Sequence, residues 1–323
     1  MPNQASPSVS SLLPVSSVSS LSSRTGSVVP QAPGSAITLH ARASSGFDAK
    51  LAATRTLLQQ AALDYAPNAA EPNTTGPHTA KSSTTDSSGH AALITQASSL
   101  GAEDMVVSHL INSMALDIPI FVLETGMLHD ETLQVLAQLK ATSRAPVQVY
   151  TPSHQTVVRF FKREGKDPMY RSIKLRKDCC NIRKMEPLAR ALAGKKAWIT
   201  GLRREQSGAR ADVPLIDTSD ATRVKFNPLA DWTWGDVWHY ISLNNVAYNP
   251  LHDQFFPSIG CAPCTRAISL GEDFRSGRWW WEDESAKECG LHVGNKGLHE
   301  SPEGEPREGH SATGPKSREK TTP

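Results

Sequence analysis

The sequence predicts an α/β domain built on a parallel, twisted sheet with helices on both faces. Residues 90–245 alternate between short apolar runs and stretches with helical apolar spacing. The clearest run is Pro119–Leu123, in which Ile, Phe, Val and Leu follow the proline without a polar break, as in a strand buried on both faces. Helical spacing is clearest at residues 130–140, where Leu133, Leu136 and Leu139 recur. Such alternation is typical of parallel strands joined by crossover helices.

The strand-like and helix-like segments can be assigned in chain order. We expect strands at residues 90–96, 119–123, 147–150 and 197–200. We expect helices at residues 103–116, 130–140, 155–163 and 187–192. Ligands of such sheets bind beyond the carboxyl ends of the strands, so the loops after the strands are the places to look for a site.

Three of these loops carry features of an anion-binding site. Ser98–Asp104 is a turn of small residues that opens a helix, and its backbone N–H groups can bind phosphate or sulfate. Leu123–Gly126 is the second loop. Thr200–Ser207 is the third, and its adjacent Arg203 and Arg204 can either contact phosphate oxygens or form a solvated surface pair. Each loop alone is also compatible with an ordinary connection.

The two ends of the chain differ in composition from the middle. Residues 1–88 form a low-complexity extension, rich in Ser and poor in aromatic residues, which we expect to be mostly disordered, above all over 1–45. Within it, residues 47–63 have helical spacing and predict a helix, and 68–89 has the composition of a linker. Residues 294–323 are polar without periodicity and predict a disordered tail. The folded domain is therefore expected at 89–293.

Bulk composition excludes several classes of protein. The net charge of +2 gives no reason to expect a nucleic-acid partner. No stretch approaches eighteen consecutive apolar residues, so no membrane span is expected. Five cysteines are an odd number, which argues against a disulfide framework and suits the reducing cytoplasm.

Four of the cysteines fall into two close pairs, Cys179-Cys180 and Cys261-Ala-Pro-Cys264. Four thiolates can hold zinc or an iron–sulfur cluster. Neighbouring cysteines are unusual in zinc sites, because their side chains tend to diverge. Basic residues surround the first pair, and they could offset the charge of a cluster or hold an anionic substrate.

Cys289 stands apart from the pairs, in the sequence Lys-Glu-Cys-Gly-Leu-His. A reactive thiol needs access to solvent and a pKa lowered by nearby cations. Spacing alone leaves two readings open, a reactive thiol and an idle surface cysteine. The candidate cations are Arg275, Arg278, Lys287 and His292.

Five motifs in the same order resemble those of the assimilatory adenylylsulfate reductases of the bacterial, cluster-containing type, within the PAPS/APS reductase family. The resemblance covers residues 91–293, about two thirds of the chain. The motifs are RKDCCNIRKMEPLARAL, ITGLRREQS, YNPLHDQFFPSIGCAPCTRA, GEDFRSGRWWWE and KECGLH.

The resemblance implies a PP-loop fold, of the adenine nucleotide α-hydrolase type, with a mobile C-terminal segment. It implies that Cys179, Cys180, Cys261 and Cys264 bind a [4Fe–4S] cluster. Cys289 would attack the sulfur of adenylylsulfate, releasing AMP and leaving a thiosulfonate. Thioredoxin or glutaredoxin would then release sulfite, in sulfate assimilation and cysteine biosynthesis.

The resemblance also implies roles for other residues, matched position by position. His292 would assist Cys289 in catalysis. The substrate-binding residues would be Ser98, Ser99, Gly101, Glu124, Thr125, Gly126, Lys184, Arg203, Arg204, Arg275 and Arg278. Two departures stand out. The loop Ser99–Asp104 lacks the glycine pattern of ATP-cleaving relatives, and Met127 stands where many family members have arginine.

Three alternatives stay open at this stage. The nucleotide could be 3′-phosphoadenylylsulfate, or both nucleotides could be accepted. A cluster-dependent PP-loop enzyme of tRNA thiolation would need an intact ATP loop. A non-enzymatic zinc or cluster module would leave Cys289 and the loops unexplained. The sequence is compatible with a homo-oligomer and does not select an oligomeric state.

Overall fold

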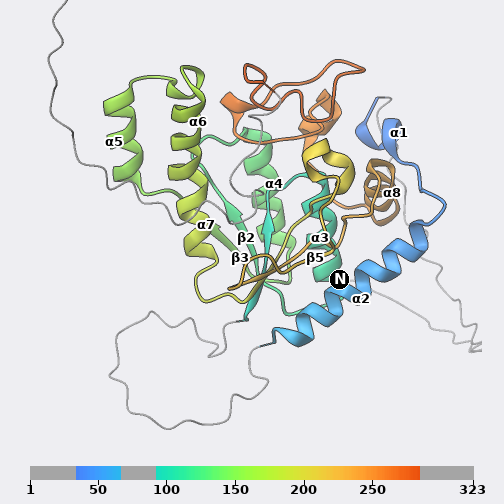
Figure 1. Cartoon of the computed structure of the whole chain (residues 1–323). Coiled ribbons are helices and arrows are strands. Elements are labelled where there is room, and N and C mark those ends of the chain that lie inside the picture. The colour runs from blue at the N-terminus through green and yellow to red at the C-terminus, as the bar shows by residue number, and fades with distance from the viewer. Residues whose placement is uncertain (1–33, 67–91, 284–323) are drawn as a thin grey trace, which may run out of the picture. The chain divides into compact units, whose positions relative to one another are not determined.

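The computed structural model describes residues 34–66 and 92–283, which contain one six-stranded sheet (Figure 1). The strand order is β3-β2-β1-β4-β6-β5, and all neighbours are parallel except β5 and β6. The strands are β1 Ile94–Ser98, β2 Ile120–Leu123, β3 Val147–Tyr150, β4 Ala197–Ile199, β5 Ile216–Asp217 and β6 Val224–Phe226. The expected α/β class with a mainly parallel sheet is confirmed.

The α-helices are α1 Ala36–His40, α2 Phe47–Asp64, α3 Ala102–Ser113, α4 Asp130–Thr142, α5 His154–Glu164, α6 Ile173–Cys180, α7 Glu186–Ala191 and α8 Trp234–Asn244. One α-helix separates β1 from β2 and another β2 from β3, three α-helices lie between β3 and β4, and α8 follows β6. Short 3₁₀ segments are Pro168–Tyr170, Arg204–Gln206, Gly208–Arg210, Pro250–Gln254 and Ala262–Cys264, and a π turn at Asn181–Met185 connects α6 to α7. All four expected strands and all four expected helices are present, within a few residues at their ends.

Alternate strand residues bury into two separate apolar clusters, so both faces of the sheet are covered. Ile120 and Ile199 pack in the larger cluster with residues of α3, α4 and α8. Phe121 and Trp198 are the sequence neighbours of these two isoleucines. They pack with Leu188 of α7 in another cluster on the opposite face. In Figure 1, α5, α6 and α7 stand together, well apart from α1 and α8.

The segment before the first strand corrects one expectation. Residues 34–45 were expected to be disordered, but α1 lies there, and its Ala36 and Ile37 belong to the main core. The helix expected at 47–63 is confirmed as α2, whose Thr54 hydroxyl accepts a hydrogen bond from Trp232 Nε1 at 3.0 Å. Residues of α1 and α2 share the main apolar core with residues of α8, which explains why this segment is folded. The domain therefore includes residues 34–66.

Several expectations fall on residues outside the described ranges. These are the disorder of residues 1–33, the whole of the linker at 68–89, and the tail at 294–323. No described helix is long and apolar enough to cross a membrane.

Candidate active site

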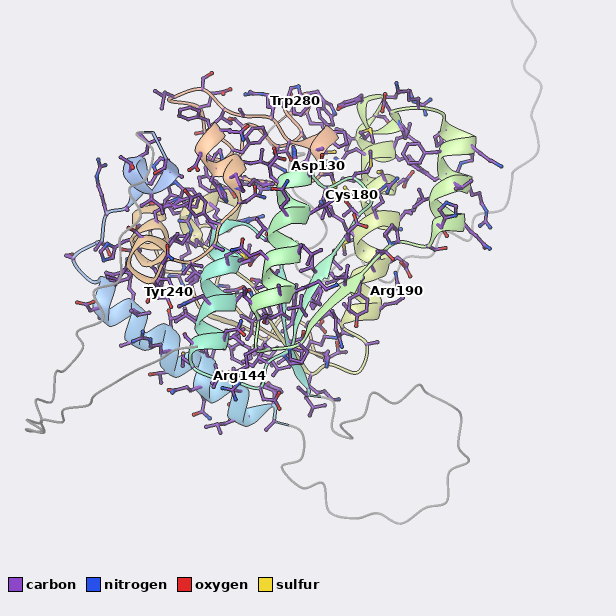
Figure 2. The ribbon with its side chains drawn as sticks, turned by 180° about the vertical axis from the view of Figure 1, so that it is seen from behind. Asp130, Arg144, Cys180, Arg190, Tyr240 and Trp280 are labelled. Atoms are coloured by element: carbon purple, nitrogen blue, oxygen red, sulfur yellow. The ribbon has the colours of Figure 1, made fainter. Side chains whose placement is uncertain are left out.

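A cavity opens at the carboxyl ends of β1, β2 and β4, where the sequence placed the site. Of the expected substrate residues, it is lined by Ser98, Ser99, Gly101, Thr125, Lys184, Arg275 and Arg278. Figure 2 shows the same edge from behind: Cys180 and Trp280 lie at the end where α4 begins at Asp130, opposite Arg144 beyond the far end of α4. The cysteine-bearing segments and the cavity therefore share one edge of the sheet.

The loop after β1 is closed by a side chain that the motifs did not single out, Asp104. Its Oδ2 accepts hydrogen bonds from the N–H of Ser99 at 2.7 Å and from the hydroxyl of Ser99 at 2.5 Å. Its Oδ1 accepts from the N–H of Gly201, at 2.9 Å. A Cβ at Gly201 would lie 2.5 Å from that same oxygen, so glycine is required there. Burial raises the pKa of Asp104 to about 6, although the hydrogen bonds from Ser99 and Gly201 act to lower it.

The loop after β4 directs its two arginines away from the cavity lining. Arg203 is fully buried and pairs with Glu103, through Nε at 2.9 Å, and with Glu205 at 2.7 Å. Arg204 is partly exposed, paired with Asp231, and donates to the carbonyl of Val213. Neither lines the cavity, so the structure does not join them with the other expected substrate residues. Two later residues of the same region, Gln206 and Arg210, do line it.

The loop after β2 connects the cavity to the cysteines. The Thr125 hydroxyl lies 3.3 Å from the sulfur of Cys261, and its carbonyl accepts a hydrogen bond from Arg183. Glu124 accepts from the N–H of Gly126 at 2.6 Å, and Gly126 adopts φ +68°, a value that favours glycine. Glu124 and Gly126 therefore shape this loop without lining the cavity themselves.

Cationic side chains form the wall of the cavity that faces the cysteines. Lys184 and Arg275 line it together with Arg278, which is 7% exposed. Arg278 Nε is buried and has no hydrogen-bond partner among the described residues, and Nη1 makes only long contacts of 3.3 and 3.4 Å to Ile259 and Ser258. A buried guanidinium with an unused donor is suited to an anionic ligand.

His252 is a further cavity residue that the motifs did not single out. Its Nδ1 lies 2.8 Å from the carbonyl of Phe256, and its Nε2 accepts the N–H of Ala102 at 3.2 Å. Burial lowers its pKa to about 4, which keeps the ring neutral at pH 7. The residue therefore holds the first turn of α3 in place as a neutral acceptor. His252 lies within the motif YNPLHDQFFPSIGCAPCTRA, but nothing in that sequence indicated this role.

The four paired cysteines come together in one apolar cluster. Cys179, Cys261 and Cys264 are buried in it beside Trp279, and Cys180 packs against it from a half-buried position. Burial raises the pKa of Cys264 to about 12 and also raises the pKa of Cys179. Lys184 and Arg278 act in the opposite direction on Cys264, so the same cations face both the cysteines and the cavity.

This chemistry fits a bound cationic centre better than free thiols. Buried thiols with raised pKa values stay protonated unless a positive centre stabilises their thiolates. No group of three or more described His, Cys, Asp or Glu side chains is arranged to hold a single metal ion. A [4Fe–4S] cluster is held by four cysteine thiolates, which is the number and kind of donor gathered here. The donor set therefore fits a cluster.

Cys289 and His292 lie outside the described residues, so their expected roles stay predictions. The described chain ends at Asp283, six residues before Cys289 in the sequence. The strap that leads there, residues 275–283, lines the cavity with Arg275, Arg278 and Trp279.

These features define an α/β protein with a cation-lined cavity beside a set of four cysteines. Residues 93–267 match the phosphoadenosine phosphosulfate reductase domain. The adenosine 5′-phosphosulfate reductase of Allochromatium vinosum is 50% identical over 197 residues, 61% of this chain and 77% of that protein. The enzyme of the same name from Neisseria meningitidis serogroup B is 50% identical over 198 residues, 61% and 80% of the two chains.

The fold also matches a solved structure. The phosphoadenylyl-sulfate reductase of Candida auris, in a phosphate complex, superposes with a TM-score of 0.50 at 21% identity, covering 70% of this chain and 98% of that one. The chain belongs to the phosphoadenosine phosphosulfate reductase family. It is an oxidoreductase that acts on a sulfur group, and the family resemblance and the fold expected from the motifs are confirmed.

Proposed function

We propose that this protein reduces adenylylsulfate to sulfite and AMP in sulfate assimilation, leading to cysteine biosynthesis. The observation that carries the proposal is the Arg278 guanidinium, which is buried against the cavity with an unused Nε donor. Lys184 and Arg275 line the same cavity. Three cations suit a nucleotide whose phosphate and sulfate both carry negative charge, because the charge shifts toward the leaving phosphate during attack.

Cys289 is the nucleophile of the proposed reaction. Its thiolate attacks the sulfur of adenylylsulfate, the bond between that sulfur and the bridging oxygen breaks, and AMP leaves with the bonding electrons. The product on the enzyme is a thiosulfonate. His292, three residues later in the sequence, assists in this step.

An external dithiol completes the cycle. One thiolate of thioredoxin or glutaredoxin attacks Cys289 Sγ of the adduct, sulfite leaves, and a mixed disulfide forms. The second thiol of the partner resolves it, so the partner is oxidised by two electrons and the sulfur is reduced by two. All four other cysteines of this chain are assigned to the cluster, which leaves none to act as an internal resolving thiol.

Cys179, Cys180, Cys261 and Cys264 would hold the [4Fe–4S] cluster. When bound, it supplies charge and shape beside the cavity rather than electrons, because the thiol scheme is already balanced. Lys184 and Arg278 act electrostatically on Cys264 and line the cavity, so they stand between the cysteines and the substrate.

The loop after β1, whose N–H groups are bonded to Asp104, supports adenylylsulfate over ATP. Asp104 already takes the N–H groups of Ser99 and Gly201 and places a carboxylate where an ATP-cleaving loop would bind phosphate. This arrangement weighs against a PP-loop enzyme of tRNA thiolation, which would need an intact ATP loop. A cytoplasmic location suits cysteines that form no disulfide.

A thioredoxin-coupled assay of sulfite release tests the proposed function. The holoenzyme is supplied in parallel with adenylylsulfate and with 3′-phosphoadenylylsulfate, with glutaredoxin in place of thioredoxin as a second arm. We expect sulfite from adenylylsulfate in amounts that match AMP. Release of sulfite only from the 3′-phosphorylated nucleotide would contradict the proposed substrate, and release of neither sulfite nor AMP would contradict the reaction.

A further inference from the structure

A buried ion pair joins the helix that carries the first cysteine pair to the end of the described chain. Arg176 of α6 donates to Glu282 through Nε at 2.9 Å and through Nη2 at 2.5 Å. The two side chains are 1% and 2% exposed. Arg176 stands three residues before Cys179, and Glu282 stands seven residues before Cys289.

The pair belongs to a connected set of contacts around Trp279. The Arg176 guanidinium lies 4.5 Å from the Trp279 ring centre, and the Arg278 guanidinium lies 4.8 Å from it. The N–H of Trp279 donates to the carbonyl of Cys264 at 3.2 Å, and the N–H of Glu282 donates to the carbonyl of Trp279 at 2.9 Å. Three segments distant in sequence are thereby joined: α6, the turn at 261–264 and the strap at 275–283.

Stability alone is a weak reason to keep such a pair. Removing two charges from water costs several kcal/mol per ion, and well-packed apolar residues of similar size often stabilise a protein as much or more. What the bidentate geometry adds is register, because two parallel hydrogen bonds fix the position and the orientation of one segment against another.

We propose that Arg176 and Glu282 are a positioning pair that fixes the root of the Cys289-bearing segment against the cysteine-bearing helix. This inference rests on the proposed role of Cys289. Seven residues span at most about 25 Å, so an anchor at Glu282 limits how far Cys289 can stand from the cavity. The pair also makes the placement of the nucleophile depend on the correct folding of α6, which carries Cys179 and Cys180.

Single substitutions would leave an unpaired buried charge and could unfold the protein, so the main test uses the double variant Arg176→Met/Glu282→Leu. It removes both charges and keeps similar volume. The matched control is Glu272→Gln. Glu272 also pairs bidentately, with Arg266 at 2.7 and 3.0 Å, in the same C-terminal part of the domain, but it does not line the cavity.

The measurements separate positioning from folding. For the double variant we expect a melting temperature and an AMP affinity close to those of the wild type. We also expect the absorbance band of the proposed iron–sulfur cluster, near ~400 nm, to be retained. We expect kcat for adenylylsulfate to fall about tenfold or more while KM changes less than about twofold, because a displaced nucleophile slows attack without weakening nucleotide binding. Glu272→Gln should match the wild type in every measurement.

Two results would overturn the inference: a kcat within about twofold of the wild type, or loss of the absorbance band together with AMP binding. The first would make the pair dispensable, and the second would make it a folding element only. Failure of the proposed function is a separate outcome, because it would appear as uptake of label from adenylylsulfate that persists in Cys289→Ser, whatever the double variant does.

Discussion

The carboxylate of Asp104 joins two loops, since it accepts the N–H of Ser99 at 2.7 Å after β1 and the N–H of Gly201 at 2.9 Å after β4. Backbone N–H groups at such positions bind phosphate in many α/β proteins. Here the protein supplies its own anion. The cations that line the cavity are Lys184, Arg210, Arg275 and Arg278.

The first prediction concerns the pH dependence of stability. Burial raises the pKa of Asp104 from 3.8 to about 6, so its contribution to stability is fully present below pH 4 and is lost as pH rises through about 6. The loss amounts to about 3 kcal/mol. The side chain introduced by Asp104→Asn cannot ionise, so the variant does not lose this stability. The free energy of unfolding of the variant minus that of the wild type should therefore rise by about 3 kcal/mol between pH 4 and pH 7.

Urea unfolding at the two pH values measures this difference. The same substitution at exposed Asp64, at the end of α2, controls for the general effect of losing a carboxylate. A difference between Asp104→Asn and the wild type that is equal at both pH values would contradict the assignment.

The second prediction concerns nucleotide selection. Asp104→Ser frees the N–H groups of Ser99 and Gly201 and removes a negative charge from the cavity wall. Binding of ATP should therefore tighten by about tenfold relative to AMP, a change that competition against adenylylsulfate turnover would measure. An unchanged ratio of the two inhibition constants would mean that this loop does not meet the phosphates.

The third prediction separates the two adjacent arginines. Arg203→Ala removes the ion partner of the buried Glu103 carboxylate and should lower the free energy of unfolding by about 3–5 kcal/mol. Arg204→Ala removes a surface pair with Asp231 and should cost less than about 1 kcal/mol, with kcat/KM within about twofold of the wild type. Denaturant unfolding and steady-state kinetics on both variants provide the measurement. A large loss of kcat/KM in Arg204→Ala would show direct substrate contact.

The fourth prediction concerns the cofactor. The wild type should be brown, with an absorbance band near ~400 nm and about four irons per chain. Serine at Cys179, Cys180, Cys261 or Cys264 should abolish the band, whereas Cys289→Ser, as the matched control, should retain it. A colourless, zinc-loaded and fully active wild type would contradict the cluster.

The sequence predicted β2 because it is a pure apolar run, whereas β5 and β6, which are only two and three residues long, were not predicted. Ile120, Phe121 and Val122 are all fully buried, which is the pattern of a strand covered on both faces. It did not predict α6, because Lys174, Arg176 and Lys177 interrupt its apolar spacing. The burial of Arg176 depends on Glu282, more than a hundred residues away, and local patterning carries no such information.

The site was predictable where a residue type implies one role. The pairing of four cysteines indicated a common site, and Lys184, Arg275 and Arg278 do face one cavity. Arg203 matches its motif equally well, but it is buried against Glu103, because only the tertiary structure decides whether an arginine meets a ligand or a carboxylate. Asp104 and His252 were missed for the same reason, since burial, which sets their pKa values, cannot be read from one sequence.

The most direct test of the central claim is transfer of label to Cys289. The holoenzyme is incubated with sulfur-35 adenylylsulfate without reductant, quenched, and separated from free nucleotide. We predict protein-bound label at about one per chain, its release as sulfite on addition of thioredoxin, and no label in Cys289→Ser. Label of equal amount in Cys289→Ser would contradict the assignment of the nucleophile, and with it the proposed mechanism.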